Sequence, residues 1–321
     1  MLVTVRSFAK INLGLGIGPS RPDGFHELRT VYQTIALHDI IRVEVKRGDG
    51  IEIRCEDPRV PKDSSNTCWK IVERAMAALK VRGRVVVDIE KRLPVQGGLG
   101  GASGNAVATL LALEKALKKQ LPGREKLRMA AEVGSDLPLF LVGGTILGVG
   151  RGEEVYPLPD LTATHCVIAT PEIGVSTPQA FADWDKLAAS NELTVANPSD
   201  RIKSFSRIIS AWLTGQSSGV PVKKGRGRAE TLLDLVRTGI ENDFEHVVFP
   251  KYPELREAKS VLERAGAFYT SLSGSGSALY GLFGSKEAAQ KAAARLVRSG
   301  IPAVATTTMT RRQYWKSVIR G

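Results

Sequence analysis

Cysteine and histidine are both scarce in this chain of 321 residues. The three cysteines, Cys55, Cys68 and Cys166, are odd in number and far apart in the sequence, which excludes a disulfide framework or a zinc knuckle built from them. The four histidines are isolated from one another, so no cluster of His and Cys predicts a permanently bound metal ion. Scarce cysteine fits a reducing compartment, and a cytoplasmic location is expected.

Long apolar runs are also missing. The longest uncharged stretch, residues 137–150, contains a proline and four glycines, and it is shorter than the roughly 20 apolar residues that span a bilayer. Near the N-terminus, Arg6 and Lys10 interrupt the apolar segment that a signal peptide needs. The sequence therefore predicts neither a membrane segment nor secretion.

Acidic residues are outnumbered by basic ones, 33 to 45, and the formal net charge is +12. This balance attracts anionic partners such as nucleotides, phosphorylated metabolites or nucleic acid, but it does not choose among them. Apolar residues make up 43% of the chain and charged residues 24%, which is an ordinary balance for a globular protein. A disordered or fibrous chain is therefore excluded, and the length allows two packed domains.

Hydrophobic periodicity predicts a mixture of strands and helices along the whole chain. Strands are predicted near residues 3–5, 41–45, 85–89, 145–149, 165–170, 268–271, 278–283 and 303–308. Helices are predicted near residues 71–79, 107–117, 125–132, 178–189, 201–213, 229–238, 252–265 and 286–299. In the second half this order favours helices over one face of an antiparallel sheet. The proline-containing stretch 153–160 is the candidate domain boundary, and the basic stretch 215–228 is typical of a solvated loop.

The strongest local motif is a glycine-rich loop at residues 93–106, directly before an apolar helix pattern; it reads Leu-Pro-Val-Gln-Gly-Gly-Leu-Gly-Gly-Ala-Ser-Gly-Asn-Ala. Such a loop suits phosphate, because missing side chains let backbone N–H groups approach an anion at a helix N-terminus. It is neither a Walker loop nor a dinucleotide-binding fingerprint. The alternative interpretation is a mobile turn in which Ser103 simply caps the helix.

Together with other segments, this loop resembles the second motif of the GHMP kinase superfamily, which wraps the phosphates of ATP. Residues 7–13, Ser-Phe-Ala-Lys-Ile-Asn-Leu, resemble the family's N-terminal strand, and residues 272–277, Leu-Ser-Gly-Ser-Gly-Ser, resemble its third motif. Residues 21–28, Arg-Pro-Asp-Gly-Phe-His-Glu-Leu, and residues 134–138, Gly-Ser-Asp-Leu-Pro, are similar to segments of the diphosphocytidyl-methylerythritol kinase subfamily. The resemblance covers nearly the whole chain.

The resemblance implies an α+β, two-domain GHMP kinase fold. The N-terminal ATP-binding domain, at residues 1–155, would be like the second domain of a small-subunit ribosomal protein. The C-terminal domain, at residues 156–321, would be ferredoxin-like, with the site in the cleft between the two.

The implied reaction transfers the γ-phosphoryl group of ATP to the 2-hydroxyl of 4-diphosphocytidyl-2-C-methyl-D-erythritol, in the non-mevalonate route to isoprenoid precursors. Mg²⁺ would accompany the nucleotide. A monomer or weak homodimer is expected, with no nucleic-acid or membrane partner.

The family's catalytic pair falls on Lys10 and Asp136. Asp136 would accept the proton of the attacking hydroxyl, and Lys10 would keep Asp136 ionised and neutralise charge on the moving phosphoryl group. Asn12 would face the same side of the strand as Lys10 and bind substrate. Taken alone, Asp136 before Leu-Pro is typical of a helix N-cap, and Lys10 of a solvated charge.

Cytidine recognition, by the same resemblance, falls on Phe25 and His26, which would stack on the base and hydrogen-bond its edge. Phe25 replaces the more usual Tyr, which keeps the stacking surface but removes a hydroxyl. Phe181 would supply a second stacking ring, in a substrate-binding segment that includes Thr177. The alternatives are a core anchor for Phe25, a turn residue for His26 and a helix cap for Thr177.

The implied nucleotide-binding residues are Asn66, Pro94, Gly97, Gly98, Leu99, Gly100, Gly101, Ala102, Ser103 and Gly104. Helix capping explains Asn66 equally well. The loop departs from the family pattern at two places: Ala102 stands where glycine is usual, and Gly104 where a second serine commonly contacts phosphate or magnesium. No protein ligand of the metal is therefore assigned.

Two other interpretations stay open. A sister enzyme such as mevalonate or homoserine kinase would be favoured if His26 had no part in substrate affinity. A nucleic-acid-binding protein is suggested by the net charge and the basic loop, although no aromatic interleaving or RNA motif supports it. The basic insertion at residues 197–228 makes the chain longer than compact members of the subfamily, and the sequence does not predict its role.

Overall fold

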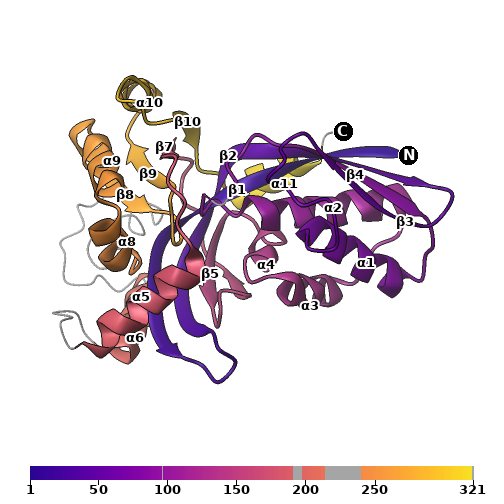
Figure 1. Ribbon diagram of the computed structural model, residues 1–321, viewed down its shortest axis with the longest axis horizontal. Helices are drawn as coiled ribbons and strands as arrows, with labels where there is room; N and C mark the ends of the chain where they lie inside the picture. Colours follow the sequence, from indigo (N-terminus) through magenta and orange to yellow (C-terminus); the bar gives the residue numbers. More distant parts are fainter. Residues whose placement is uncertain (96, 191–196, 214–239, 320–321) are drawn as a thin grey trace.

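The computed structural model describes residues 1–95, 97–190, 197–213 and 240–319, which form two lobes, each built on its own β-sheet (Figure 1). The sheet of the first lobe has the strand order β3-β4-β2-β5-β6, with β1 paired to β2. Its strands are β1 (Leu2–Ser20), β2 (His26–Lys46), β3 (Gly50–Cys55), β4 (Arg84–Glu90), β5 (Thr145–Val149) and β6 (Glu154–Pro157). All of these pairings are antiparallel except that of β3 with β4.

Helices cover one face of this first sheet (Figure 1). They are α1 (Thr67–Leu79), α2 (Gly101–Leu117), α3 (Gly123–Val133) and α4 (Leu137–Phe140). The apolar residues that predicted α1 and α2, among them Ile71 and Leu110, are fully buried against the sheet in a common core. The last helix, α11 (Arg311–Val318), returns to the first lobe and adds Tyr314 and Val318 to the same core. Helix α2 packs against β1, β2 and α1, which fixes the glycine-rich loop at its start.

The second lobe confirms the expected antiparallel sheet with packed helices. Its strand order is β10-β7-β9-β8, formed by β7 (His165–Ala169), β8 (Tyr269–Leu272), β9 (Leu279–Phe283) and β10 (Ala303–Thr307). The helices are α5 (Thr177–Ala189), α6 (Pro198–Leu213), α8 (Glu245–Lys251), α9 (Pro253–Arg264) and α10 (Lys286–Arg298). The predicted helix at residues 229–238 and the basic loop at residues 215–228 lie outside the described residues.

The hairpin of β1 and β2 joins the two lobes (Figure 1). Alternation predicted strands near residues 3–5 and 41–45, and both are confirmed, although the strands extend well beyond these stretches: β1 has 19 residues and β2 has 21. Ile11 and Leu13 of β1 pack in one core with Tyr280 of the second lobe, while Val3 belongs to the first core. In the middle of β1, Ile11 and Leu13 alternate with Lys10 and Asn12, yet all four side chains are buried, so both faces of the strand are covered by protein.

The stretch expected to hold the domain boundary, residues 153–160, contains β6, which pairs with β5 in the first sheet. The second sheet starts later, with β7 at His165. Since α11 also returns to the first lobe, the division at residues 155 and 156 stays a prediction. In the described part of the chain, none of the helices combines the length and apolar character that a membrane span requires.

Candidate active site

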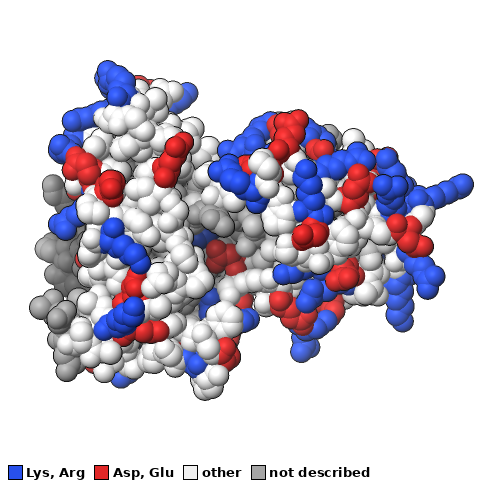
Figure 2. All heavy atoms as spheres, in the orientation of Figure 1, with Lys and Arg blue, Asp and Glu red and all other residues white. Residues whose placement is uncertain are grey.

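Lys10 and Asp136 lie side by side and line one cavity. In the space-filling view a hollow separates the two lobes (Figure 2). Lys10 lies in the middle of β1, and its side chain is only 4% exposed. Its Nζ is 3.4 Å from Oδ2 of Asp136, the residue directly before α4. A buried ammonium is costly unless it is paired, so the carboxylate compensates the charge that β1 carries into the interior.

The Asp136 carboxylate does not cap the helix that it precedes. No side-chain capping hydrogen bond is formed there, and Asp136 instead accepts the hydroxyl of Tyr32 at 3.1 Å. Burial, together with the nearby Asp136 charge, raises the pKa of Tyr32 well above its usual value. Tyr32 therefore keeps its proton and acts as a donor that holds Asp136 in place. Tyr32 was not predicted as a site residue.

A chain of hydrogen bonds orients the Lys10 ammonium from the other side. Lys10 Nζ donates to Asn12 Oδ1 at 2.7 Å, and Asn12 Nδ2 donates to Thr30 Oγ1 at 2.7 Å. The Thr30 hydroxyl in turn donates to the carbonyl of Gly14 at 2.7 Å. Because each group has a defined partner, the Asn12 amide is fixed with its oxygen toward the ammonium. Direct binding of substrate by Asn12 stays a prediction.

The glycine-rich loop starts from a buried anchor at Asp39. One carboxylate oxygen of Asp39 accepts the backbone N–H groups of Arg92 and Leu93 at 2.7 Å each, and the other accepts Lys91 Nζ at 2.5 Å. Asp39 is completely buried, so these three donors satisfy a charge that would otherwise be costly. The loop therefore leaves β4 in one defined direction.

Glycines let the loop pass close to both lobes. Gly98 and Gly100 have φ values of 71° and 69°, in the left-handed region that favours glycine. A Cβ added at Gly98 would lie 2.1 Å from the carbonyl oxygen of Ser273, and one at Gly100 would lie 3.0 Å from the Lys10 side chain. Ser273, in the third glycine-rich motif, also donates its hydroxyl to the Gly98 carbonyl at 2.9 Å. The loop is thus held between β1 and the second lobe.

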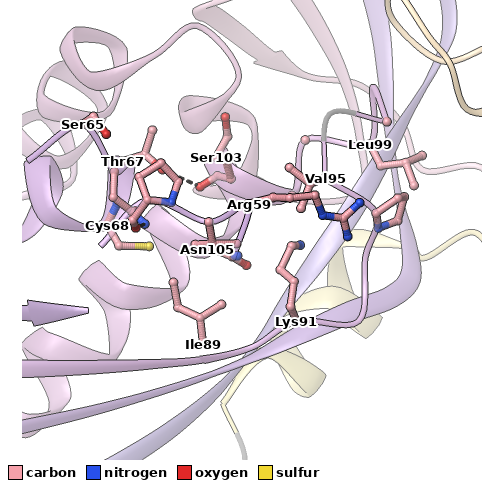
Figure 3. Close-up of a pocket in the computed structure, with 18 of the residues that line it drawn as sticks. Arg59, Ser65, Thr67, Cys68, Ile89, Lys91, Val95, Leu99, Ser103 and Asn105 are labelled. Carbon is pink, nitrogen blue, oxygen red and sulfur yellow. Dashed lines mark hydrogen bonds between the residues drawn. The ribbon is translucent and has the colours of Figure 1, made fainter. Parts of the chain in front are cut away.

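A cavity of about 380 Å³, here called the loop cavity, opens over the start of α2 (Figure 3). No side chain caps this helix at Gly100, so its first N–H groups remain available to an anion. The predicted nucleotide-binding residues that line the loop cavity are Asn66, Pro94, Gly97, Gly98, Leu99, Gly100, Gly101, Ala102 and Ser103.

Gly104 does not line the loop cavity, although the resemblance implied that it would bind the nucleotide. It packs against β1, where an added Cβ would lie 2.9 Å from both the Phe8 carbonyl oxygen and the Ser7 hydroxyl. This close approach is a physical reason for glycine in place of the family's second serine. Ala102, the other departure, accepts the Thr67 hydroxyl at its carbonyl oxygen at 2.9 Å.

Asn66 at the cavity wall caps α1, as the sequence allowed. Its Oδ1 accepts the Cys68 backbone N–H at 2.8 Å, and its Nδ2 donates to the Pro61 carbonyl at 2.6 Å. Both polar groups of Asn66 are thus engaged by the backbone, and contact with a nucleotide stays a prediction.

Residues that sequence reasoning missed also line the loop cavity, as Figure 3 shows for Arg59, Lys91 and Asn105. Asn105 Oδ1 is buried without a hydrogen-bond partner among the described residues. Asn105 belongs to the glycine-rich motif and Lys91 lies two residues before it, which is the signal that could have pointed to them. Burial raises the pKa of the nearby Cys68 thiol to about 12, so this cysteine is an inert part of the wall.

Replacing Gly98 with alanine is expected to raise the KM for ATP by about tenfold or more, because the left-handed backbone costs an L-residue roughly 1–2 kcal/mol. In addition, the new Cβ would collide with the Ser273 carbonyl oxygen, which must move the loop. Steady-state kinetics with ATP varied measure the effect. Gly266→Ala is the matched control, because Gly266 also has a positive φ but nothing lies within 4 Å of its Cβ position. Equal KM values in the two variants would contradict a phosphate-holding role of Gly98.

A second and larger cavity, here called the hairpin cavity, has a volume of about 610 Å³ and lies between the β1–β2 hairpin and α5. Predicted site residues that line it are Lys10, Asn12, Phe25, His26, Asp136, Thr177 and Phe181. The hairpin cavity shares Gly98 and Gly100 with the loop cavity. The two cavities therefore meet at the glycine-rich loop, next to Lys10.

The far end of the hairpin cavity is built around His26, the first residue of β2. The His26 ring stacks on Phe181 of α5, with centroids 4.8 Å apart and planes 11° apart. Its Nε2 lies 2.7 Å from Oδ1 of Asp185, one helical turn after Phe181, and 3.2 Å from the Ser20 hydroxyl. Asp185 was not predicted. A pairing of Nε2 with this carboxylate favours the tautomer that carries its proton there and leaves Nδ1 as an acceptor.

The wall beside this end comes from two segments of the second lobe, α5 and the third motif. The Thr177 hydroxyl lies 2.7 Å from the Ser275 hydroxyl of the third motif, so Thr177 is oriented toward the cavity rather than used as a simple helix cap. Ser176, the preceding residue, is the one that caps α5. Asn242 holds the third motif by donating to the carbonyl oxygens of Leu272 and Gly274, each at 2.8 Å.

Comparison with protein families gives two matches. The family model described as "GHMP kinases N terminal domain" matches residues 66–144, and the model described as "GHMP kinases C terminal" matches residues 224–302. The first contains the glycine-rich loop and Asp136, and the second contains the third motif.

Curated relatives and solved structures agree with these matches. A 4-diphosphocytidyl-2-C-methyl-D-erythritol kinase of Solibacter usitatus is 38% identical over 284 residues, covering 88% of this chain and 82% of the relative. The kinase of the same description from Acaryochloris marina is 34% identical and covers 91% of each chain. A crystal structure of 4-(cytidine 5'-diphospho)-2C-methyl-D-erythritol kinase is 27% identical, with a TM-score of 0.71 and coverage of 95% and 98%. Homoserine kinase from Cytophaga hutchinsonii has the same TM-score at 20% identity, covering 96% of this chain and 95% of that one, and shares the fold.

Proposed function

The chain belongs to the GHMP kinases and, within them, to the 4-diphosphocytidyl-2-C-methyl-D-erythritol kinases, and we propose that it phosphorylates the 2-hydroxyl of 4-diphosphocytidyl-2-C-methyl-D-erythritol with ATP. It is an ATP-dependent small-molecule kinase of the non-mevalonate route to isoprenoid precursors. We place the reaction in the cytoplasm, the compartment that supplies ATP.

One observation carries the assignment of the reacting groups: the Lys10–Asp136 pair lies where the two cavities meet. A nucleotide in the loop cavity would direct its terminal phosphate along the start of α2 toward Gly98 and Gly100. An acceptor in the hairpin cavity would reach the same point from the other side. This arrangement supports direct transfer between two bound substrates, which depends mainly on positioning and charge stabilisation.

In the proposed transfer, the 2-hydroxyl of the acceptor gives its proton to the Asp136 carboxylate while its oxygen bonds to the γ-phosphorus of ATP. The bond from that phosphorus to the bridging oxygen breaks, and ADP leaves. Lys10 stabilises the charge on the moving phosphoryl group and is kept in place by Asn12. Tyr32 orients Asp136 by donating its hydroxyl to Oδ1, while Oδ2 faces Lys10, so the carboxylate is held beside the group that stabilises the phosphoryl charge.

The far end of the hairpin cavity suits cytosine. Phe181 and Phe25 offer apolar ring faces for stacking, and Phe25 is 47% exposed and so accessible to a ligand. With Nε2 protonated toward Asp185, His26 offers an acceptor for the exocyclic amino group of cytosine. Uracil has a carbonyl oxygen at that position and cannot donate, so the pair supports selection of cytidine.

Magnesium is proposed to enter with ATP. Among the described residues, no three His, Cys, Asp or Glu side chains gather at a common point, so an ion would be held mainly by phosphate oxygens and water. Ser103 adds a hydroxyl at the wall of the loop cavity, which fits such a site. Magnesium bound in this way neutralises charge on the phosphates during transfer.

Phosphoryl transfer from ATP and Mg²⁺ to 4-diphosphocytidyl-2-C-methyl-D-erythritol tests the proposal, with mevalonate and homoserine offered in parallel. We expect kcat/KM to be higher for the first acceptor by about a hundredfold or more. Mevalonate and homoserine have no cytosine, so they leave the hydrogen-bonding groups of the cytosine site without partners. ADP release gives the rate, and mass spectrometry of the product identifies the monophosphorylated acceptor.

The two competing interpretations give different results in the same assay. Preferred turnover of mevalonate or homoserine would contradict the cytidine assignment while leaving the kinase fold intact. If none of the three acceptors is phosphorylated and the protein binds RNA with an affinity that falls steeply with salt concentration, a nucleic-acid-binding protein would be favoured instead.

A further inference from the structure

We propose that Arg151 binds the diphosphate group of the acceptor and so selects cytidine diphosphate compounds over cytidine itself. Arg151 lies in the turn between β5 and β6 and lines the hairpin cavity, yet it matches no motif described above. The inference rests on the proposed function, since it assumes an acceptor whose diphosphate joins cytidine to the polyol.

The position of the turn places Arg151 between the two ends of the hairpin cavity. At the cytidine end, the Leu28 backbone N–H donates to the Gly150 carbonyl at 2.7 Å, which ties the turn to the start of β2. At the reacting end, Gly152 approaches Tyr32 so closely that an added Cβ would lie 2.4 Å from the Tyr32 hydroxyl. The diphosphate of the acceptor must lie between the same two ends, because it connects base and polyol.

The charges on the cavity wall also point to Arg151. The charged side chains that line the hairpin cavity in the described residues are those of Lys10, Asp136, Arg151 and Asp185. Lys10 is paired with Asp136 at the reacting end, and Asp185 faces His26. Arg151 pairs with Glu153 through Nε, and Glu153 does not line the cavity, so the terminal amino groups of Arg151 remain for the diphosphate, which would otherwise enter a cavity with two carboxylates.

The guanidinium is held in a fixed orientation before any ligand arrives. It stacks over the Phe25 ring with 4.6 Å between the guanidinium carbon and the ring centroid, and its Nε lies 3.2 Å from Oε1 of Glu153. Within the described residues, no hydrogen bond engages its two terminal amino groups. These groups form the planar fork that matches two phosphate oxygens, so little entropy is lost when it binds.

The alternative role for Arg151 is structural: a cation that only covers the exposed Phe25 ring. The two roles differ in which part of the ligand they affect. Stacking on Phe25 supports the base and would affect cytidine and cytidine diphosphate equally, whereas a phosphate contact affects only the diphosphate. Binding of the two compounds to the same protein therefore separates them.

The test is isothermal titration of cytidine and of cytidine diphosphate into the full-length protein and into Arg151→Gln. We expect Arg151→Gln to weaken cytidine diphosphate binding by about tenfold to a hundredfold, the usual value of one charge-assisted hydrogen-bonded contact, and to leave cytidine binding unchanged. Arg151→Lys should recover part of the loss, because it restores the charge without the fork. Thermal unfolding of each variant monitors the fold.

Arg21→Gln is the matched control for general loss of positive charge. Arg21 lies in the same hairpin turn region as Phe25 but pairs with Asp23 and Glu27 and does not line the cavity. An equal loss for cytidine and cytidine diphosphate in Arg151→Gln, or an equal loss in Arg21→Gln, would overturn the proposal for Arg151. If the unaltered protein bound neither compound, the proposed function itself would fail, and this result is distinct from the other two.

Discussion

Replacing Asp136 with asparagine is expected to lower kcat by about a hundredfold to ten-thousandfold, the usual range for loss of a general base. Asparagine keeps the shape of the side chain but cannot take up the proton of the acceptor hydroxyl at neutral pH. ATP and acceptor should still bind, because both cavities keep their walls. Single-turnover kinetics with saturating ATP and acceptor measure the chemical step directly, without a contribution from product release.

The matched control is Asp183→Asn on the surface of α5. Asp183 also forms an ion pair with a lysine, Lys251, at 2.9 Å, but it lies outside both large cavities. We expect Asp183→Asn to keep the kcat of the unaltered protein. A decrease of less than about tenfold in Asp136→Asn would contradict the assignment of Asp136 as the base and leave it a role in orienting Lys10.

The sequence predicted the site best where the spacing of residues within one helix or strand decides their geometry. Lys10 and Asn12 are two residues apart on a strand, so their side chains were expected on one side, and the structure joins them by a hydrogen bond. The glycine-rich loop before α2 was likewise visible, because glycine and the apolar helix pattern are local signals. The role of Asp136 was ambiguous, because its local sequence equally fits a helix N-cap. Its contact with Lys10 depends on the tertiary structure, which the local sequence does not show.

The residues that sequence reasoning missed share a physical cause. Tyr32, Arg151 and Asp185 reach the hairpin cavity only because β2, the β5–β6 turn and α5 pack around it. No period or motif in the sequence encodes which faces of these elements meet. The full extent of the β1–β2 hairpin also depends on tertiary contacts: the middle of β1 is buried on both faces, and its polar residues Lys10 and Asn12 pair with other protein groups instead of facing solvent.

Replacing Lys10 with methionine is expected to lower kcat/KM by about a hundredfold to a thousandfold, the cost of removing one preorganised group that stabilises transition-state charge. Methionine has a similar length and fits an apolar interior, so the cavity wall is kept. The loss should fall mainly on kcat, since Lys10 faces the moving phosphoryl group rather than the adenosine or cytidine ends. Steady-state kinetics with each substrate varied in turn separate kcat from the two KM values.

Lys126→Met serves as the matched control, because Lys126 is also a partly buried lysine paired with a carboxylate, Glu114, at 3.1 Å, but it lies away from both cavities. Its kcat should equal that of the unaltered protein. The double variant Lys10→Met with Asp136→Asn adds a sharper test of the pair. If Lys10 and Asp136 act in the same step, the double variant should lose little more activity than the worse of the two single variants. If the loss in the double variant equals the product of the two single losses, Lys10 and Asp136 act independently.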